Sequence, residues 1–259
     1  MASWLHAVVP AAAGLTSSVL AVRVLRRYRQ RRRPHHLFWG IGLVMYAVGG
    51  WAEVHRALFG FTDLGFRLWY LSGAVLGAAY LGQGTAYLLL RPRVADALTV
   101  LLLAGSALAA WRVMTAVLDP AAAQGVELTG RVIVSPGVRV LTPFFNVYGT
   151  LLLVGGAAYS AWQFYRRGGS RDRMIGNVLI AAGGLAPAIG GTLSRFGLPG
   201  LYVGELVGAV LLYEGFVRAS ASRAPAGAAA PSSPAVPRAC PAPRRPWRPW
   251  RPWRPRVAG

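Results

Sequence analysis

Seven stretches of this 259-residue chain are long and apolar enough to be candidates for crossing a lipid bilayer. A run of about 18 or more apolar residues is typical of a transmembrane helix. In lipid, only helices and closed barrels satisfy every backbone polar group, and these stretches lack the two-residue period of a strand. The sequence therefore predicts an all-α integral membrane protein with seven transmembrane helices. The predicted segments are residues 4–22, 37–58, 67–90, 95–117, 139–165, 174–194 and 199–217.

The arginines fall mostly on one side of these predicted helices. Of the 28 basic residues, 22 lie in the connections after the first, third and fifth segments or in the C-terminal tail. Basic connections stay in the cytoplasm, so we expect an inner-membrane protein with its amino end outside and its carboxyl end inside. Since these arginines border membrane segments, they are expected to contact the bilayer and its anionic headgroups rather than nucleic acid.

The chain contains no lysine, which excludes several kinds of site. A retinal Schiff base, a nucleotide-binding P-loop and pyridoxal chemistry all need a lysine. The sequence also contains no HExxH, CxxC or GxSxG motif, and Cys240 is its single cysteine. We therefore predict no cofactor, no metal and no internal disulfide.

The second and third segments resemble the sixth and seventh. Both triplets of segments would begin outside, so this would be a parallel repeat with the fourth segment as connector. Such a three-plus-one-plus-three layout is similar to that of SWEET-type sugar transporters, although none of their sequence motifs is present. Chance matching between segments rich in small apolar residues is the alternative. The matching motifs are Ile41-Gly42 with Ile175-Gly176, Gly49-Gly50 with Gly183-Gly184, and GAVL at 73–76 with GAVL at 208–211.

Residues 221–259 differ from the rest of the chain. From about Arg223 the composition changes to Ala, Pro, Ser and Arg, with no acidic residue. Such a segment cannot bury a core, so we predict a disordered cytoplasmic tail after a seven-helix bundle of residues 1–220.

The tail ends PRRPWRPWRPWRPR, with a period of three. A polyproline II helix, with three residues per turn, would place its tryptophans in one column and its arginines in another. Both residue types favour a membrane surface. An unselected low-complexity extension and stacking on single-stranded RNA are the alternatives. The predicted membrane-surface residues are Trp247, Trp250, Trp253, Arg248 and Arg251.

Glu53 lies inside the second apolar stretch, where a charge is costly. Insertion scales assign about 2.5–3.5 kcal/mol to a charged side chain at the centre of a membrane helix. From the helical rise, Glu53 would lie about 6 Å below the outer boundary. Tyr46, Gly49 and Gly50 precede it on the same helix face, and small residues there allow another helix to approach. This stripe predicts a packed interior face, whereas pairing of Glu53 with Arg56 is the simpler alternative.

Glu205 in the seventh segment is predicted at a similar depth, about 8–10 Å from the outer boundary. It has no cation on its own helix, so it needs a partner from another segment, water or a proton. In the sixth segment Pro187, within GGLAPAIGG, predicts a broken helix, with an ordinary proline kink as the alternative. The predicted ligand-binding residues are Glu53, Glu205, Tyr46, Tyr70, Asn146 and Pro187.

Other polar residues of the segments have simpler explanations. Glu214 and Arg218 have the i, i+4 spacing of an ion pair on one helix. Arg67 and Arg112 lie near the outer boundary, where a long side chain can reach the headgroups. The two histidines at residues 35–36 sit among arginines and are expected to be solvated.

Together these residues predict a polytopic inner-membrane protein that binds or transports a small polar or cationic solute through an outward-facing polar cavity. The two carboxylates would bind the cation or carry a proton. One alternative is a membrane scaffold or sensor that transports nothing and in which the tail is the working part. The other is an intramembrane enzyme that uses the carboxylates as acid and base.

Overall fold

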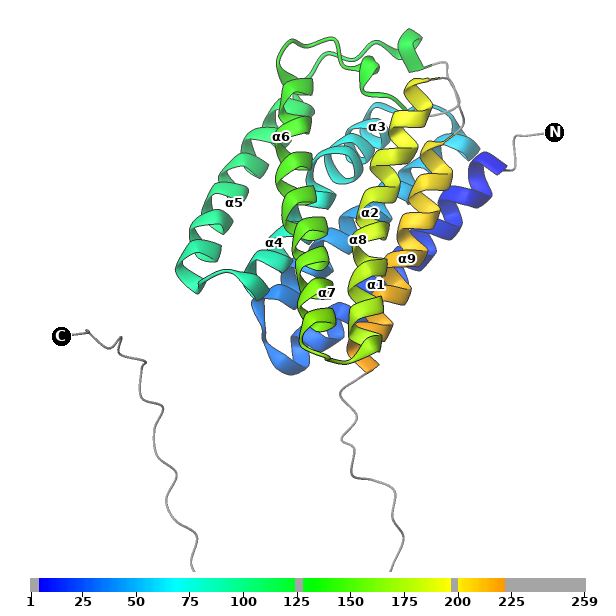
Figure 1. The fold of residues 1–259 in the computed structure, drawn as a ribbon. Helices are drawn as coiled ribbons and strands as arrows, with labels where there is room; N and C mark the ends of the chain where they lie inside the picture. The colour runs from blue at the N-terminus through cyan, green and yellow to red at the C-terminus, as the bar shows by residue number, and fades with distance from the viewer. Residues whose placement is uncertain (1–4, 124–127, 197–199, 222–259) are drawn as a thin grey trace, which may run out of the picture. The chain divides into compact units, whose positions relative to one another are not determined.

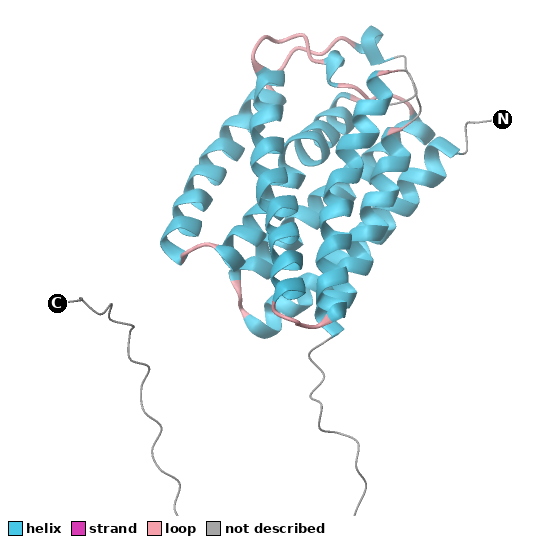
Figure 2. Ribbon diagram, in the orientation of Figure 1, coloured by secondary structure: helices cyan, strands magenta, loops and turns pink. Residues whose placement is uncertain are grey.

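The computed structural model describes residues 5–123, 128–196 and 200–221 (Figure 1). These residues are largely helical (Figure 2) and contain no β-strand, although an isolated bridge joins Leu118 and Ile133. The all-α prediction is therefore confirmed for this part of the chain. The predicted membrane-surface residues of the tail, from Trp247 to Trp253, lie outside it.

The helices follow one another with short connections, apart from the longer one at residues 115–137. Two π-helical segments, η1 (Tyr70–Leu76) and η4 (Leu151–Gly155), join α3 to α4 and α6 to α7 without interruption. The 115–137 connection holds two short 3₁₀ helices, η2 (Pro120–Ala123) and η3 (Gly130–Val132). The helices are α1 (Leu5–Arg31), α2 (Pro34–Phe59), α3 (Asp63–Trp69), α4 (Gly77–Leu89), α5 (Pro92–Met114), α6 (Val138–Thr150), α7 (Gly156–Arg166), α8 (Arg171–Arg195) and α9 (Leu201–Ala221).

Five helical stretches among the described residues are long and apolar enough to cross a membrane. They are His6–Arg31, Pro34–Phe59, Pro92–Met114, Val138–Arg166 and Arg171–Ser194. The continuous helix from Asp63 to Leu89 matches the third predicted segment in position but is made more polar by Gln83 and its glycines. Helix α9 matches the seventh segment but carries three charged residues. The chain thus has several helices typical of a membrane-embedded protein, and crossing by all seven segments stays a prediction.

Helix boundaries follow the local sequence. Pro34 and Pro92 each occupy the first turn of a helix, where the missing N–H is not needed and the fixed φ fits. Gly60 ends α2 with a φ of 85°, and Gly137 precedes α6 with a φ of 78°, which glycine adopts without strain. Thr62 caps α3 by accepting a hydrogen bond of 3.2 Å from the Gly65 N–H.

Helix α2 packs against both α1 and the helix of residues 63–89. It does so through adjacent glycines. A methyl group on Gly49 would lie 3.2 Å from the Gly73 Cα, and one on Gly50 would lie 3.1 Å from the Gly14 nitrogen. Small residues thus let α2 approach two neighbours at one level, which is the packed interior face predicted from the sequence.

Helix α8 packs along α9, and its path differs from the prediction. It continues through Pro187 as one α-helix, so the predicted break is not present. Because Pro187 has no N–H, the Gly183 carbonyl loses its partner within the helix. That carbonyl faces α9, where a methyl group on Gly208 would lie 2.9 Å from it. Close packing on a glycine of α9 therefore accommodates the proline without interrupting the helix.

Two arginines that were expected to extend towards the headgroups instead donate hydrogen bonds to backbone carbonyls in or beside the 115–137 connection. Arg67 caps the end of α5, donating hydrogen bonds of 2.9 Å to the Met114 and Ala116 carbonyls. Arg112 donates one of 2.7 Å to the Pro136 carbonyl. The guanidinium groups thus satisfy carbonyl groups that a helix end and its following loop leave free.

The histidines at 35 and 36 were expected to be solvated, and this expectation was wrong. Each is only 9% exposed, and their ring centroids lie 4.2 Å apart beside the indole of Trp39. They fall on the first turn of α2, so they pack inward with that helix. The predicted pair of Glu214 and Arg218 is present, with a nitrogen-to-oxygen distance of 3.7 Å.

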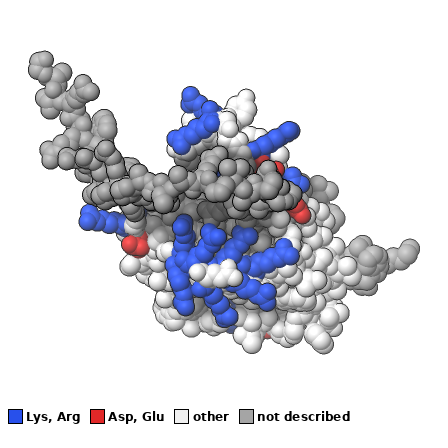
Figure 3. Space-filling model, turned by 90° about the horizontal axis from the view of Figure 1, so that it is seen from below, with Lys and Arg blue, Asp and Glu red and all other residues white. Residues whose placement is uncertain are grey.

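The arginine-rich connections meet at one end of the described helices, which we call the basic end (Figure 3). It comprises the arginines of residues 23–33, 91–93, 166–173 and Arg218. The α1–α2 and α7–α8 junctions lie there together in Figure 1, and the 115–137 connection lies at the opposite end.

Candidate functional site

Tyr46 connects α2, the helix that carries Glu53, to the backbone of α9 at Glu205. Its hydroxyl donates a hydrogen bond of 2.8 Å to the backbone carbonyl of Glu205 on α9. Glu53 lies on the same helix as Tyr46, two turns further along α2. The structure thus brings the backbone of Glu205 to the face of α2 that carries Tyr46, and the proximity of the two carboxylates stays a prediction.

Glu53 is held in the interior by a residue that the sequence analysis did not single out. Its side chain is only 1% exposed, and its Oε1 accepts a hydrogen bond of 2.8 Å from the Trp69 indole N–H. Trp69 is itself buried at the end of α3. Leaving a buried polar group without its hydrogen-bond partner costs about 1–3 kcal/mol. We call Tyr46, Glu53, Trp69 and Glu205 the interior acid site.

Pro187 borders the interior acid site through the α8–α9 crossing. A methyl group on Gly208 would lie 2.9 Å from the Tyr46 hydroxyl oxygen and 3.1 Å from the Pro187 Cδ. Gly208 is therefore the point at which α2, α8 and α9 meet. The glycine leaves room for the tyrosine hydroxyl to reach the Glu205 carbonyl.

The other two predicted residues make contacts elsewhere. The Tyr70 hydroxyl pairs with the Thr142 hydroxyl at 2.7 Å, although its ring lies beside Trp69, with centroids 6.1 Å apart. The Asn146 amide donates a hydrogen bond of 3.0 Å to the Ala74 carbonyl in η1. A π segment has fewer and differently placed helical hydrogen bonds than an α-helix, so Asn146 supports the irregular backbone.

A second polar group, centred on Gln83, was also missed. Gln83 is fully buried, and its amide nitrogen donates to the Ala95 carbonyl at 2.8 Å and to the Thr99 hydroxyl at 2.7 Å. Its oxygen accepts a hydrogen bond from the Tyr148 hydroxyl. The available signal was a lone amide within the apolar run of residues 67–90. The three helices that it joins could not be identified from that signal.

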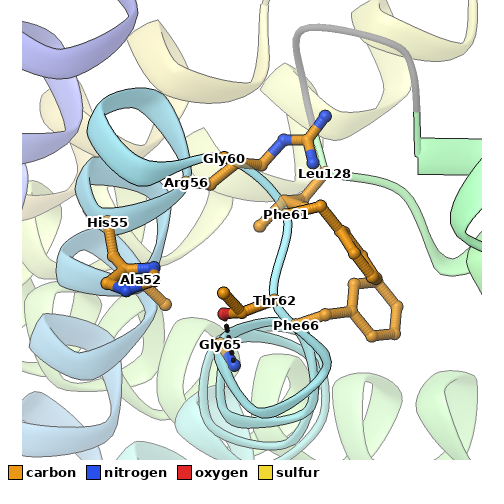
Figure 4. Close-up of a pocket in the computed structure, with 9 residues that line it drawn as sticks. All are labelled: Ala52, His55, Arg56, Gly60, Phe61, Thr62, Gly65, Phe66 and Leu128. Atoms are coloured by element: carbon orange, nitrogen blue, oxygen red, sulfur yellow. Dashed lines mark hydrogen bonds between the residues drawn. The ribbon is translucent and has the colours of Figure 1, made fainter.

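A small hollow lies at the C-terminal end of α2, beside the N-terminus of α3 (Figure 4). Its volume of about 10 Å³ is no more than one water molecule needs. Neither carboxylate of the interior acid site is among its lining residues. The hollow therefore does not correspond to the predicted outward-facing cavity. It is lined by Ala52, His55, Arg56, Gly60, Phe61, Thr62, Gly65, Phe66 and Leu128.

The contact between Trp69 and Glu53 leads to a first prediction. Trp69→Phe keeps a buried aromatic ring but removes the N–H donor, so we expect the free energy of unfolding to fall by about 1.5–3 kcal/mol. Denaturant unfolding in mild detergent measures this change. Trp51→Phe is the matched control, because Trp51 is 44% exposed and donates only to the neutral Ser18 hydroxyl. Equal losses in the two variants would contradict a special role for the Glu53 contact.

Comparisons of the chain with models of protein families, with curated proteins and with solved structures find no match.

Proposed function

We propose that the chain is a seven-span inner-membrane protein whose interior acid site binds a small cation or a proton. The basic end would face the cytoplasm, following the rule that arginine-rich connections stay inside. On this orientation Glu53 and Glu205 lie towards the outer face. The seven helical segments between Leu5 and Ala221 that match the predicted positions support this arrangement.

The observation that carries the proposal is that α2 bears a fully buried carboxylate, Glu53, and also meets α9 at the backbone of Glu205 through Tyr46. Glu53 and Glu205 come from separate helices: Glu53 is buried beside Trp69, and the Glu205 backbone carbonyl accepts the hydrogen bond of the Tyr46 hydroxyl. Intramembrane acidic residues are costly and are found mainly where they serve ion or proton binding. Two negative charges in one apolar region repel each other, and uptake of one positive charge relieves that repulsion. The site thus has the chemistry of a cation or proton acceptor.

Packing around the interior acid site favours a small occupant. Glu53 is buried against Trp69, and Tyr46 is held at the crossing of α8 and α9. A proton or a monatomic cation fits such surroundings, whereas an organic solute would require the helices to separate. We therefore propose a narrower class of ligand than the sequence alone indicated.

The predicted internal repeat gains support from the helix crossings. In the sequence alignment Gly49 corresponds to Gly183, and Gly73 corresponds to Gly208. Gly49 meets Gly73 where α2 crosses η1, and Gly183 meets Gly208 where α8 crosses α9. Chance similarity of composition would not place aligned glycines at equivalent crossings. We propose that the two hairpins are a duplicated unit and that each contributes one carboxylate to the site.

A flux measurement in proteoliposomes tests the proposed function. A trapped pH-sensitive dye reports proton entry driven by a potassium diffusion potential, and radioactive sodium uptake provides the cation probe. We expect the protein to raise one of the two fluxes over protein-free liposomes. Glu53→Gln and Glu205→Gln should each reduce that flux at least tenfold, because the amide keeps the shape but not the charge.

Glu214→Gln is the control for this experiment. Glu214 is also an acidic residue of α9, but it is partly exposed and paired with Arg218. Its replacement should leave the flux within twofold of that of the unaltered protein. A flux that is insensitive to both interior substitutions, or equally sensitive to Glu214→Gln, would refute the proposal.

A membrane scaffold or sensor is the second candidate. Hydrogen bonds between polar groups of the interior, such as that from Tyr46 to the Glu205 carbonyl, favour this candidate, because groups paired with each other need no ligand. This alternative predicts no proton or sodium flux. It also predicts loss of cellular function when residues 223–259 are deleted, while the helical part stays folded.

A further inference from the structure

The basic end is strongly and unevenly charged. Fourteen arginines lie in its segments, whereas the same segments and the adjoining helix turns contain three acidic residues, Asp96, Asp172 and Glu214. Asp96 accepts a hydrogen bond from Tyr87, and Glu214 pairs with Arg218. Most of the positive charge therefore lacks a neutralising carboxylate nearby within the described residues, and Figure 3 shows the side chains gathered on one face. Such a face attracts anions.

Arginine determines which anion suits this face. Its planar guanidinium binds phosphate oxygens in a bidentate manner, and it stacks on aromatic rings, whereas lysine acts as a point charge. The chain uses arginine alone, without any lysine. Phosphate groups are therefore the matching ligand chemistry.

Aromatic side chains beside the basic end indicate which kind of molecule bears the phosphate group. On α7, Tyr159, Trp162 and Tyr165 are 48%, 51% and 74% exposed. The Arg166 guanidinium lies 5.0 Å from the centroid of the Trp162 ring. Exposed tyrosine and tryptophan bordered by arginine are typical of the headgroup level of a membrane. The phosphate is thus expected at a lipid surface.

The junction of α1 and α9 holds two guanidinium groups in place. Arg23 lies over the Tyr213 ring at 4.9 Å from its centroid, and Arg27, one turn later, donates a hydrogen bond to the Ser220 hydroxyl. Both arginines belong to α1, and both contacts are on α9. Each contact uses only part of the guanidinium, which has five N–H donors in all. The pair is thereby oriented while donors stay available.

Exposed apolar residues continue from this junction along both helices. Val22 of α1 is 48% exposed, and Val217 of α9 is 38% exposed, each next to the arginine junction. We propose that an anionic phospholipid binds here, with its phosphate on Arg23 and Arg27 and its acyl chains along α1 and α9. Basic sites between helices at the cytoplasmic side are suited to such headgroups. This proposal is independent of the interior acid site.

Lipid titration of the full-length protein in mild nonionic detergent tests this site. Phosphatidylglycerol should raise the thermal unfolding midpoint and remain bound in native mass spectrometry, whereas phosphatidylcholine should do neither. Arg23→Gln with Arg27→Gln should increase the half-saturating phosphatidylglycerol concentration at least tenfold. If that double variant does not fold, Arg27→Gln alone should still produce about a fivefold increase, as expected for one basic residue at an anionic surface.

Two further double variants, each lacking two arginines, distinguish binding at a defined site from general attraction to positive charge. Arg131→Gln with Arg139→Gln removes the same charge from exposed residues outside the basic end and should change the half-saturating concentration by less than twofold. Arg91→Gln with Arg93→Gln, at the basic end, should change it less than the Arg23 and Arg27 pair does. Equal effects of those two basic-end pairs would overturn the assigned junction. The same increase in the thermal unfolding midpoint with phosphatidylcholine, with millimolar inorganic phosphate or with a single-stranded RNA would show that the ligand is not specifically an anionic phospholipid.

Discussion

Replacing Gly149 by alanine is expected to prevent the close approach of α4 and α6 and to reduce the yield of folded protein severely. A methyl group at this position would overlap the Ala78 carbonyl and lie 2.6 Å from the Ala79 nitrogen. The opposing surface is equally tight, because a methyl group on Gly82 would lie 2.8 Å from the Gly149 oxygen. The atoms in the way are backbone, so no rotation of a side chain can relieve the overlap.

The expected magnitude follows from overpacking. Inserting a methyl group into a packed core typically costs about 1–3 kcal/mol, and rigid backbone on the other side places this variant at the upper end or beyond. Unfolding in mixed detergent micelles, together with size-exclusion chromatography, measures the loss. Gly155→Ala, six residues later on the same helical run, is the control, because nothing lies within 4 Å of its added methyl group.

We expect Gly155→Ala to keep or raise the free energy of unfolding, since alanine favours a helix by up to about 1 kcal/mol over glycine. If Gly149→Ala is as stable as Gly155→Ala, the close crossing of α4 and α6 is incorrect. If both variants are destabilised equally, the effect belongs to helix propensity and not to packing.

The contrast between these glycines shows how far the sequence could predict the packing. Gly49, Gly183 and Gly208 could be singled out because they recur in matching motifs, and they do lie at helix crossings. Gly149 belongs to no matching motif, and such a glycine in an apolar run has the same appearance whether it faces lipid or a backbone. Only the positions of neighbouring helices distinguish the two.

The interior acid site was partly predictable for a related reason. The burial of Glu53 followed from the small residues on its helix face. The proximity of the Glu205 carboxylate, expected from equal depth in matching hairpins, stays a prediction. Trp69 could not be assigned, because a lone tryptophan in an apolar run has the same appearance whether or not its N–H meets a carboxylate. The π segment that begins directly after Trp69 rotates the following residues away from a 3.6-residue period. Extrapolation of helix faces through residues 70–76 therefore fails, and with it the placement of Gln83.

Gln83→Leu should destabilise the protein by about 1–3 kcal/mol, although it replaces a polar side chain by an apolar one in an apolar setting. The loss arises because the Tyr148 hydroxyl, which donates to the Gln83 oxygen, is left without that acceptor. Thr99 is less affected, since its hydroxyl also donates to the Ala95 carbonyl at 2.9 Å. Denaturant unfolding in detergent micelles measures the change.

The double variant Gln83→Leu with Tyr148→Phe separates this explanation from a simple packing defect. Removing both partners leaves neither group unsatisfied, so the double variant should be destabilised by less than the sum of the single variants. A packing defect at Gln83 would instead persist in the double variant and add to the effect of Tyr148→Phe. Strict additivity would therefore show that the hydrogen bond does not couple α4 to α6, and that their association rests on the glycine crossing alone.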